Sequence, residues 1–265
     1  MATKEQRVEK LIRYAGDRMA HKDYMTALKC LNKVIKLEPE QSDHYLNRSM
    51  ILYHLDKLDL ALVDVERALR LDNNDADAYY NRGMIHQKQS NIDEALLDYS
   101  HAVHCDERYV KAYYQRATLF FDIQEYEEAM LDLNAVTEIN PDDTDAYFVR
   151  ALIHFESDYP DWAVEELTKA IAINDKNAQY YYLRGIAYHM VKDHPNALLD
   201  WNKTLELQPK SLDTWLLRAQ LFLEYGRFDR AFKDFQRVLK MQPDNQLAQD
   251  GLQAAREKQN YIPHE

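Results

Sequence analysis

The sequence repeats itself with a period of 34 residues, and this period runs from residue 8 to residue 245 without an insertion or a deletion. Position 4 of each repeat is large, position 8 is alanine, serine or glycine, and position 20 is alanine in every repeat. The seven repeats begin at Val8, Ser42, Ala76, Val110, Thr144, Ala178 and Leu212. A period of this length means that the chain folds as a stack of one small supersecondary unit.

The apolar residues inside each repeat follow helical spacing rather than the alternation of a strand. Positions 4, 8 and 11 form one apolar face, and positions 20, 24 and 27 form a second one after a polar break such as residues 89–91. Small residues at positions 8 and 20 let two helices approach closely, and proline at position 32 of four repeats ends the second helix. Each repeat is therefore predicted to be a helical hairpin, helix A followed by helix B, in an all-α chain.

This pattern, extending over residues 8–245, resembles the tetratricopeptide repeat family. The resemblance implies a right-handed α-solenoid superhelix of seven hairpins, in which helix A lines a concave face and helix B the convex face. After the repeats, residues 246–265 are predicted to form a capping helix and a short tail, because Leu247, Ala248, Leu252 and Ala255 recur at helical spacing. Residues 1–7 are expected to be an N-terminal extension.

Arginine recurs at position 7, and an acidic residue at position 23, in repeats two to seven. The six pairs of residues are Arg48 and Asp64, Arg82 and Asp98, Arg116 and Asp132, Arg150 and Glu166, Arg184 and Asp200, and Arg218 and Asp234. The first repeat lacks both, with Tyr14 and Cys30 in their places. Because only pairing within a repeat leaves no charge without a partner, six structural ion pairs between helix A and helix B are predicted. The alternative is that the arginines bind an anionic ligand.

The family resemblance implies that ligands contact helix A at positions 2, 5, 6, 9, 12 and 13. The candidate groove residues at these positions are Asn47, Met50, Tyr53, Tyr80, Asn81, Met84, Tyr114, Gln115, Phe121, Phe148, Phe155, Tyr182 and His189. Amides at regular spacing can hydrogen-bond the backbone of an extended peptide, while aromatic residues and methionines accept its side chains. We interpret the helix A face of repeats two to five as a peptide groove. The alternative is that its aromatic residues pack against the neighbouring hairpin and belong to the core.

One subfamily clamps the carboxylates of chaperone tails with lysine, asparagine and arginine at fixed positions, and no window of this chain supplies that cationic set. The net charge of -12 and the acidic residues at position 2 would repel a polyanion, so nucleic acid is not expected as a partner. A neutral or basic protein or peptide is favoured over an acidic one. Acidic residues in the first turn of a helix also suit its dipole, which is an alternative reason for their presence.

No arrangement of residues points to catalysis. The sequence contains no HExxH, phosphate loop, Gly-x-Ser-x-Gly or CxxC motif, and His101 and His104 are the one histidine pair at helical spacing. We therefore expect a non-enzyme without metal or cofactor. Cys30 and Cys105 are predicted to be free thiols because nothing in their spacing indicates a disulfide.

No apolar run approaches the roughly 20 residues that a membrane span requires, and the start of the chain lacks the apolar region of a signal peptide. A cytoplasmic location without membrane contact is therefore expected. The predicted function is a protein–protein interaction scaffold that binds a peptide or helical segment in its concave groove. The alternative is a self-assembling structural scaffold that acts through its ends or its convex face, and the sequence leaves the oligomeric state open.

Overall fold

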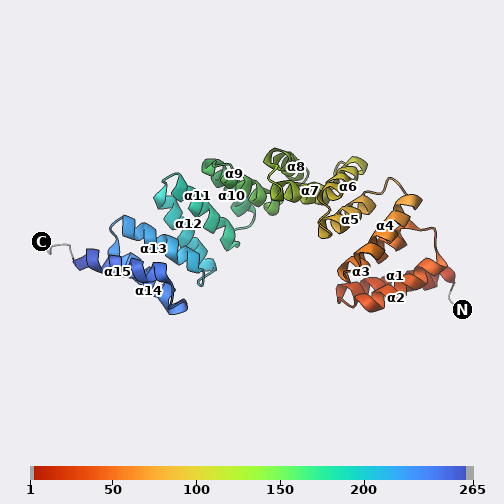
Figure 1. Ribbon diagram of the computed structural model, residues 1–265, viewed down its shortest axis with the longest axis horizontal. Helices are drawn as coiled ribbons and strands as arrows, with labels where there is room; N and C mark the ends of the chain where they lie inside the picture. The colour runs from red at the N-terminus through yellow and green to blue at the C-terminus, as the bar shows by residue number, and fades with distance from the viewer. Residues whose placement is uncertain (1–2, 261–265) are drawn as a thin grey trace. The chain divides into compact units, whose positions relative to one another are not determined.

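The computed structural model describes residues 3–260, and over this range the chain consists of fifteen α-helices and no strand (Figure 1). The helices are α1 Lys4–Ala20, α2 Tyr24–Leu37, α3 Ser42–His54, α4 Leu58–Leu71, α5 Ala76–Lys88, α6 Ile92–Cys105, α7 Val110–Asp122, α8 Tyr126–Ile139, α9 Thr144–Glu156, α10 Pro160–Ile173, α11 Ala178–Met190, α12 His194–Leu207, α13 Leu212–Glu224, α14 Phe228–Met241 and α15 Gln246–Asn260. The prediction of an all-α chain built from helical hairpins is confirmed. The predicted tail, residues 261–265, lies outside the described residues.

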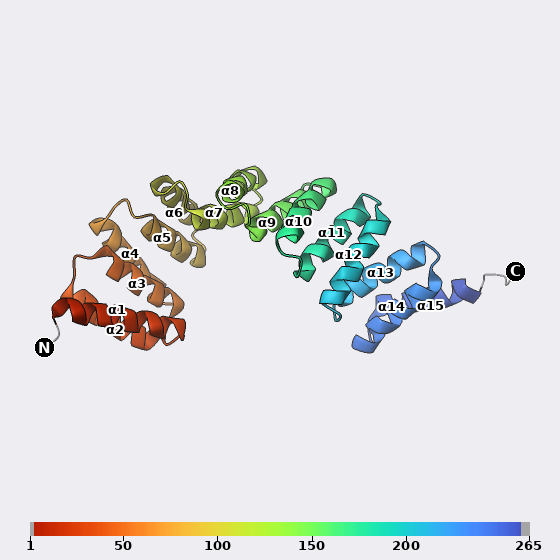
Figure 2. The same cartoon turned by 180° about the vertical axis from the view of Figure 1, so that it is seen from behind.

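The helices form two compact halves, residues 1–140 with α1 to α8 and residues 141–265 with α9 to α15. Within each half, the hairpins follow one another in chain order, as the two opposite views show (Figures 1 and 2). The most extensive packing joins the two helices of one hairpin, and inside a half each B helix also packs against the A helix that follows it. These two kinds of contact bury a series of apolar clusters along each half.

The core of each hairpin lies where small residues bring helix A and helix B together. The alanine at position 20 is fully buried in all seven repeats, and so is the larger residue at position 24, apart from 1% exposure in three of them. The residues at position 24 are Leu31, Val65, Tyr99, Leu133, Leu167, Trp201 and Phe235. A large side chain on helix B therefore fills the space that the small residue at position 8 of helix A leaves open.

The first helix begins earlier than the sequence repeat. α1 starts at Lys4, so residues 4–7 of the predicted N-terminal extension form its first turn. The reason is a capping box: Thr3 Oγ1 accepts a hydrogen bond from the Gln6 backbone, and Gln6 Oε1 accepts one from the Thr3 backbone. The other A helices, α3, α5, α7, α9, α11 and α13, begin at the first residue of their repeats.

The last helix, α15, packs against α13 and α14. Its residues Ala248 and Ala255 are fully buried, and Leu252 packs on the same apolar cluster as Phe235. Leu247 belongs to the apolar set predicted to face the core, but it is exposed. Because Leu247 directly precedes Ala248, it points about 100° away around the helix, and both residues cannot face the same neighbour.

The turn between helix A and helix B has the same backbone conformation in every repeat. Its position 15 lies in the left-handed region, with φ between 59° and 68°, and only the last repeat has glycine there. The seven residues are Lys22, Asp56, Ser90, Gln124, Asp158, Lys192 and Gly226. A residue with a side chain is strained in this conformation by roughly 1–2 kcal/mol.

We expect Gln124→Gly to raise the free energy of unfolding by about 0.5–1 kcal/mol. The substitution removes the left-handed strain, and the greater freedom of glycine in the unfolded chain offsets part of the gain. Urea unfolding followed by circular dichroism measures the difference. The reverse change at the equivalent turn, Gly226→Ala, should lower stability by a similar amount, and an unchanged or less stable Gln124→Gly protein would contradict this account of the turn.

Candidate functional site

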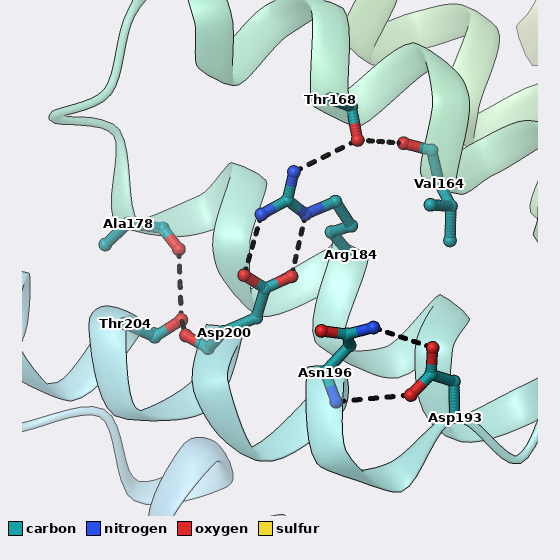
Figure 3. Close-up of polar contacts among 8 residues, drawn as sticks. All are labelled: Val164, Thr168, Ala178, Arg184, Asp193, Asn196, Asp200 and Thr204. Carbon is teal, nitrogen blue, oxygen red and sulfur yellow. Dashed lines mark hydrogen bonds and ion pairs between the residues drawn. The ribbon is translucent and has the colours of Figure 1, made fainter.

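Six arginine–carboxylate pairs join helix A to helix B inside repeats two to seven, and we call them the arginine ladder. The pairs are Arg48–Asp64, Arg82–Asp98, Arg116–Asp132, Arg150–Glu166, Arg184–Asp200 and Arg218–Asp234. In the pair drawn in Figure 3, Arg184 Nε donates to Asp200 Oδ2 at 2.7 Å and Nη2 donates to Oδ1 at 2.8 Å. All six acidic residues are at most 5% exposed, so each pair is largely removed from water.

The arginines of four pairs also donate a hydrogen bond to a side chain of the preceding repeat. Nη1 of Arg184 donates to Thr168 Oγ1 on α10 at 3.0 Å (Figure 3), and Nη1 of Arg116 donates to Ser100 Oγ on α6 at 2.8 Å. Arg48 and Arg218 make the same contact with the asparagine at that position. The sequence carries a signal for this hydrogen bond, because position 25 is Asn, Ser or Thr in each of these preceding repeats. One arginine thus ties together three helices.

An aromatic ring at position 4 covers each guanidinium of the ladder. The distance from the guanidinium carbon to the ring centre lies between 4.7 Å for Trp215 and 5.9 Å for Tyr147. The hydrogen bond with Asp132 raises the pKa of Arg116 above its ordinary value, which keeps the guanidinium charged. With hydrogen bonds at the edge and a ring on the face, the arginine side chains remain only 14–26% exposed. This geometry favours a structural role over binding of an anion.

The candidate groove residues divide between the two halves of the chain. The N-terminal half carries Asn47, Met50, Tyr53, Tyr80, Asn81, Met84, Tyr114, Gln115 and Phe121 on α3, α5 and α7. The C-terminal half carries Phe148, Phe155, Tyr182 and His189 on α9 and α11. The predicted groove of repeats two to five therefore does not lie within one half. We call positions 2, 5, 6, 9, 12 and 13 of α3, α5 and α7 the inner face of the N-terminal half.

The aromatic residues among the candidates contribute to the core with part of their surface. The Tyr80 ring lies 5.4 Å from the Tyr109 ring and 5.9 Å from the Tyr99 ring, and burial raises the pKa of the Tyr80 phenol. In the C-terminal half, the Phe148 ring lies 5.7 Å from that of Tyr180. Each of these candidate rings is half-buried, so the core role that the sequence left as an alternative holds for one side of the ring.

His189 is also tied into its surroundings. Its Nδ1 lies 3.2 Å from Nδ1 of His194, and its ring lies 5.8 Å from the ring of the buried Trp201. Among the described residues, no group of three or more histidine, cysteine, aspartate or glutamate residues is placed to hold a metal ion. His101 packs against the Tyr79 ring at 5.0 Å. These histidines therefore act as packing residues of their hairpins.

Asn81 on α5 has the most informative environment of the candidates. The residue is only 9% exposed, and its side-chain amide has no hydrogen-bond partner among the described residues. The amide atoms are not among the fully enclosed polar atoms of those residues, so they still reach the surface. Asn47, at the same position of the preceding repeat, is exposed. Sequence spacing predicted two equivalent amides, whereas the structure has one exposed amide and one that is nearly buried and unpaired.

Two charged residues of the inner face, Asp77 and Lys88, already have partners within the same half. Tyr109 Oη donates a hydrogen bond to the Asp77 carboxylate, and burial together with this bond raises the pKa of the Tyr109 phenol. Lys88 Nζ lies 2.9 Å from Asp56 Oδ1 and 4.6 Å from the centre of the Tyr53 ring. The sequence pattern predicted neither contact, because each involves a residue type that does not recur from repeat to repeat at its position.

Comparison with known proteins identifies the family. Profiles of the tetratricopeptide repeat match residues 76–109, 110–143 and 212–245, and a further profile of the TPR repeat matches residues 50–90. No curated protein matches the sequence significantly.

Among the described residues, no helix has both the length and the apolar character of a membrane span.

Solved structures show the same fold. The C-terminal part of a TPR repeat-containing protein from Cytophaga hutchinsonii is 20% identical and superimposes with a TM-score of 0.79, covering 91% of this chain and 99% of that one. A tetratricopeptide repeat protein from Parabacteroides merdae is 21% identical with a TM-score of 0.62, covering 95% and 99%. YrrB, described as a TPR protein with an unusual peptide-binding site, is 23% identical with a TM-score of 0.60, covering 69% and 95%. The chain belongs to the tetratricopeptide repeat family.

Proposed function

We propose that the protein is a non-catalytic interaction scaffold that binds a peptide segment of a partner protein on the inner face of the N-terminal half. The observation that carries this proposal is the Asn81 amide, which is nearly buried and lacks a partner within the described chain. The amide atoms reach the surface, where water can bond them, so a ligand that covers Asn81 has to replace those hydrogen bonds with its own. A peptide backbone can do so, whereas an apolar ligand would leave the amide unsatisfied. The partner segment lies across α5, over Asn81 and its helical neighbours.

The chemistry of the inner face suits a peptide backbone. The Asn81 amide offers two donor hydrogens and one acceptor oxygen, which complement the C=O and N–H groups of a peptide. Asn47 and Gln115 repeat the amide 34 residues before and after it. Between these amides, Tyr80 and Met84 are half-buried and present apolar surface to side chains of the ligand.

The charge of the face favours a neutral or basic ligand. The face carries three exposed aspartates, Asp43, Asp77 and Asp122, and two exposed lysines, Lys88 and Lys111, so acidic residues are in slight excess. The arginines of the ladder do not offset this charge, because their guanidinium groups are paired with buried carboxylates. YrrB, which shares the fold, has a peptide-binding site of its own, and this is compatible with the proposal.

The test selects binders from a displayed library of short peptides on the full-length protein and measures their affinity by calorimetry. Asn81→Ala should weaken a selected peptide by about 10–100-fold, which corresponds to about 1.4–2.8 kcal/mol. Asn73→Ala, in the exposed turn before α5, is the matched control and should leave the affinity unchanged. Selected peptides that bind the Asn81→Ala protein as tightly as the unchanged protein would overturn the proposal.

A substitution of Asn81 is expected to change peptide affinity without lowering the free energy of unfolding. Because the Asn81 amide forms no bond within the described chain, Asn81→Leu should leave the free energy of unfolding unchanged or raise it by up to about 1 kcal/mol. A structural asparagine would instead destabilise the protein when replaced. Loss of binding together with retained stability is the expected combination.

A further inference from the structure

The outer sides of α6 and α8 expose two leucines at the same repeat position. Leu97 on α6 is 59% exposed and Leu131 on α8 is 69% exposed. Both occupy position 22, which lies on helix B, and neither belongs to the inner face described above. Large exposed apolar side chains that recur in neighbouring repeats indicate a surface for interaction.

Acidic residues flank both leucines. Asp93 and Glu94 precede Leu97 by four and three residues, so they lie on the same side of α6. Glu127 and Glu128 hold the same relation to Leu131 on α8. None of these four carboxylates has a hydrogen-bond or ion-pair partner among the described residues. The helix dipole favours acids in a first turn, but it does not account for exposed leucines next to them.

A hollow of about 460 Å³ lies between α6, α7 and α8, and neither leucine lines it. Its lining residues are Val103, His104, Glu107, Tyr113, Ala135, Glu138 and Ile139. His104 lies seven residues after Leu97, and Ala135 lies four residues after Leu131, so each leucine shares a helical row with the lining. The hollow has apolar side chains together with two more carboxylates, those of Glu107 and Glu138.

We propose that this outer surface of α6 and α8 binds a basic segment of a partner protein that carries apolar side chains between its lysines or arginines. The apolar side chains cover Leu97 and Leu131, and the cations pair with the flanking carboxylates. The arginine beneath the surface, Arg116, does not compete, because Asp132 and Ser100 already accept its hydrogen bonds. This surface is separate from the proposed peptide site on α3, α5 and α7.

A second copy of the chain fits the surface less well. Its basic row on α14 consists of Arg230, Lys233, Arg237 and Lys240, all exposed. Within the described chain, α14 has no exposed large apolar side chain. Pairing with α14 would therefore leave the two leucines uncovered. The other basic row, Lys29, Lys33 and Lys36 on α2, has one exposed large apolar side chain, Met25, so it would cover at most one of the two leucines. We therefore assign the surface to a different protein.

The C-terminal half offers a matched control. Leu199 on α12 also occupies position 22 and is 63% exposed. The residues three and four positions before it are Asn196 and Pro195 in place of the acids. Leu199 thus reproduces the exposed leucine without the charge.

The experiment uses a fluorescent amphipathic helical peptide of leucine and lysine, and a peptide with glutamate in place of lysine, against the full-length protein. Fluorescence anisotropy should detect binding of the lysine peptide only, and binding should weaken as salt is added. The double variant Leu97→Lys, Leu131→Lys should lower this affinity at least about tenfold, because it introduces like charges and removes apolar contacts. Leu199→Lys should change it less than about twofold. Circular dichroism checks that all variants are folded.

Three outcomes would overturn the proposal: no binding of the lysine peptide, equal losses in the double variant and in Leu199→Lys, or equal binding of the glutamate peptide. Loss of binding in Asn81→Ala alone would place the probe on the inner face. Sedimentation velocity gives the last check, since oligomers that dissociate in the Leu97→Lys, Leu131→Lys variant would make a second copy the occupant and contradict the assignment to another protein.

Discussion

Asp200→Ala is expected to lower the free energy of unfolding by about 3–5 kcal/mol, the cost of leaving one charge of a buried pair without its partner. The substitution removes both carboxylate oxygens of Asp200, which accept hydrogen bonds from Nε and Nη2 of Arg184 at 2.7 and 2.8 Å (Figure 3). Thr168 accepts from the remaining nitrogen and cannot neutralise the charge. Urea unfolding can be followed by the fluorescence of Trp201, which is buried on the same helix.

Glu206→Ala provides the control on the same helix. Glu206 accepts from Lys203 Nζ at 3.0 Å, but both side chains are largely exposed, so this change should leave stability almost unaltered. The double replacement Arg184→Met, Asp200→Leu should recover most of the loss, because apolar residues of similar volume leave no charge behind. If Asp200→Ala cost no more than Glu206→Ala, the arginine ladder would not hold the hairpins together.

Gly185→Ala is expected to lower the free energy of unfolding by about 1–3 kcal/mol, although alanine is the better helix former. A Cβ atom at residue 185 would lie 2.5 Å from Nε1 of Trp201, a side chain that is 1% exposed and cannot move aside. Thermal or urea unfolding measures the loss. The glycine is required here because position 24 of this repeat carries tryptophan.

Gly16→Ala tests whether the loss comes from packing. No atom lies within 4 Å of a Cβ built at Gly16, so this substitution in α1 should raise stability by up to about 1 kcal/mol. In the Gly185→Ala background, Trp201→Leu should cost less than it does alone. The resulting pair is the one found in repeat five, where Ala151 stands at position 8 and Leu167 at position 24. Strictly additive losses would contradict a direct clash between residues 185 and 201.

The fold was predictable from the sequence because the same pattern recurs in all seven repeats. This pattern marks where each helix starts, where the chain turns and which small residues lie at the contact between the two helices. The earlier start of α1 was also written in the sequence, as the capping box from Thr3 to Gln6, but it lies outside the 34-residue register. The division of the chain into two halves after Asn140 could not be predicted, because the 34-residue period continues across this point in the sequence. Periodicity describes what one hairpin does, and it does not report how strongly successive hairpins pack.

The candidate site was predictable in its helical positions and not in its burial. Asn47 and Asn81 have the same place in the repeat, yet the first is exposed and the second nearly buried. The burial of a side chain on a solenoid depends on residues of adjacent repeats, and these residues differ along the chain. The contact of Tyr109 with Asp77 depends in the same way on a residue particular to one repeat, because no other repeat ends in tyrosine.

A crystal structure of the full-length protein bound to a display-selected peptide tests the central claim most directly. The account predicts that the peptide backbone lies within hydrogen-bond distance of the Asn81 amide and covers Tyr80 and Met84 on α5. A peptide bound elsewhere, with the Asn81 amide still without a partner, would contradict the assignment of the inner face as the binding site.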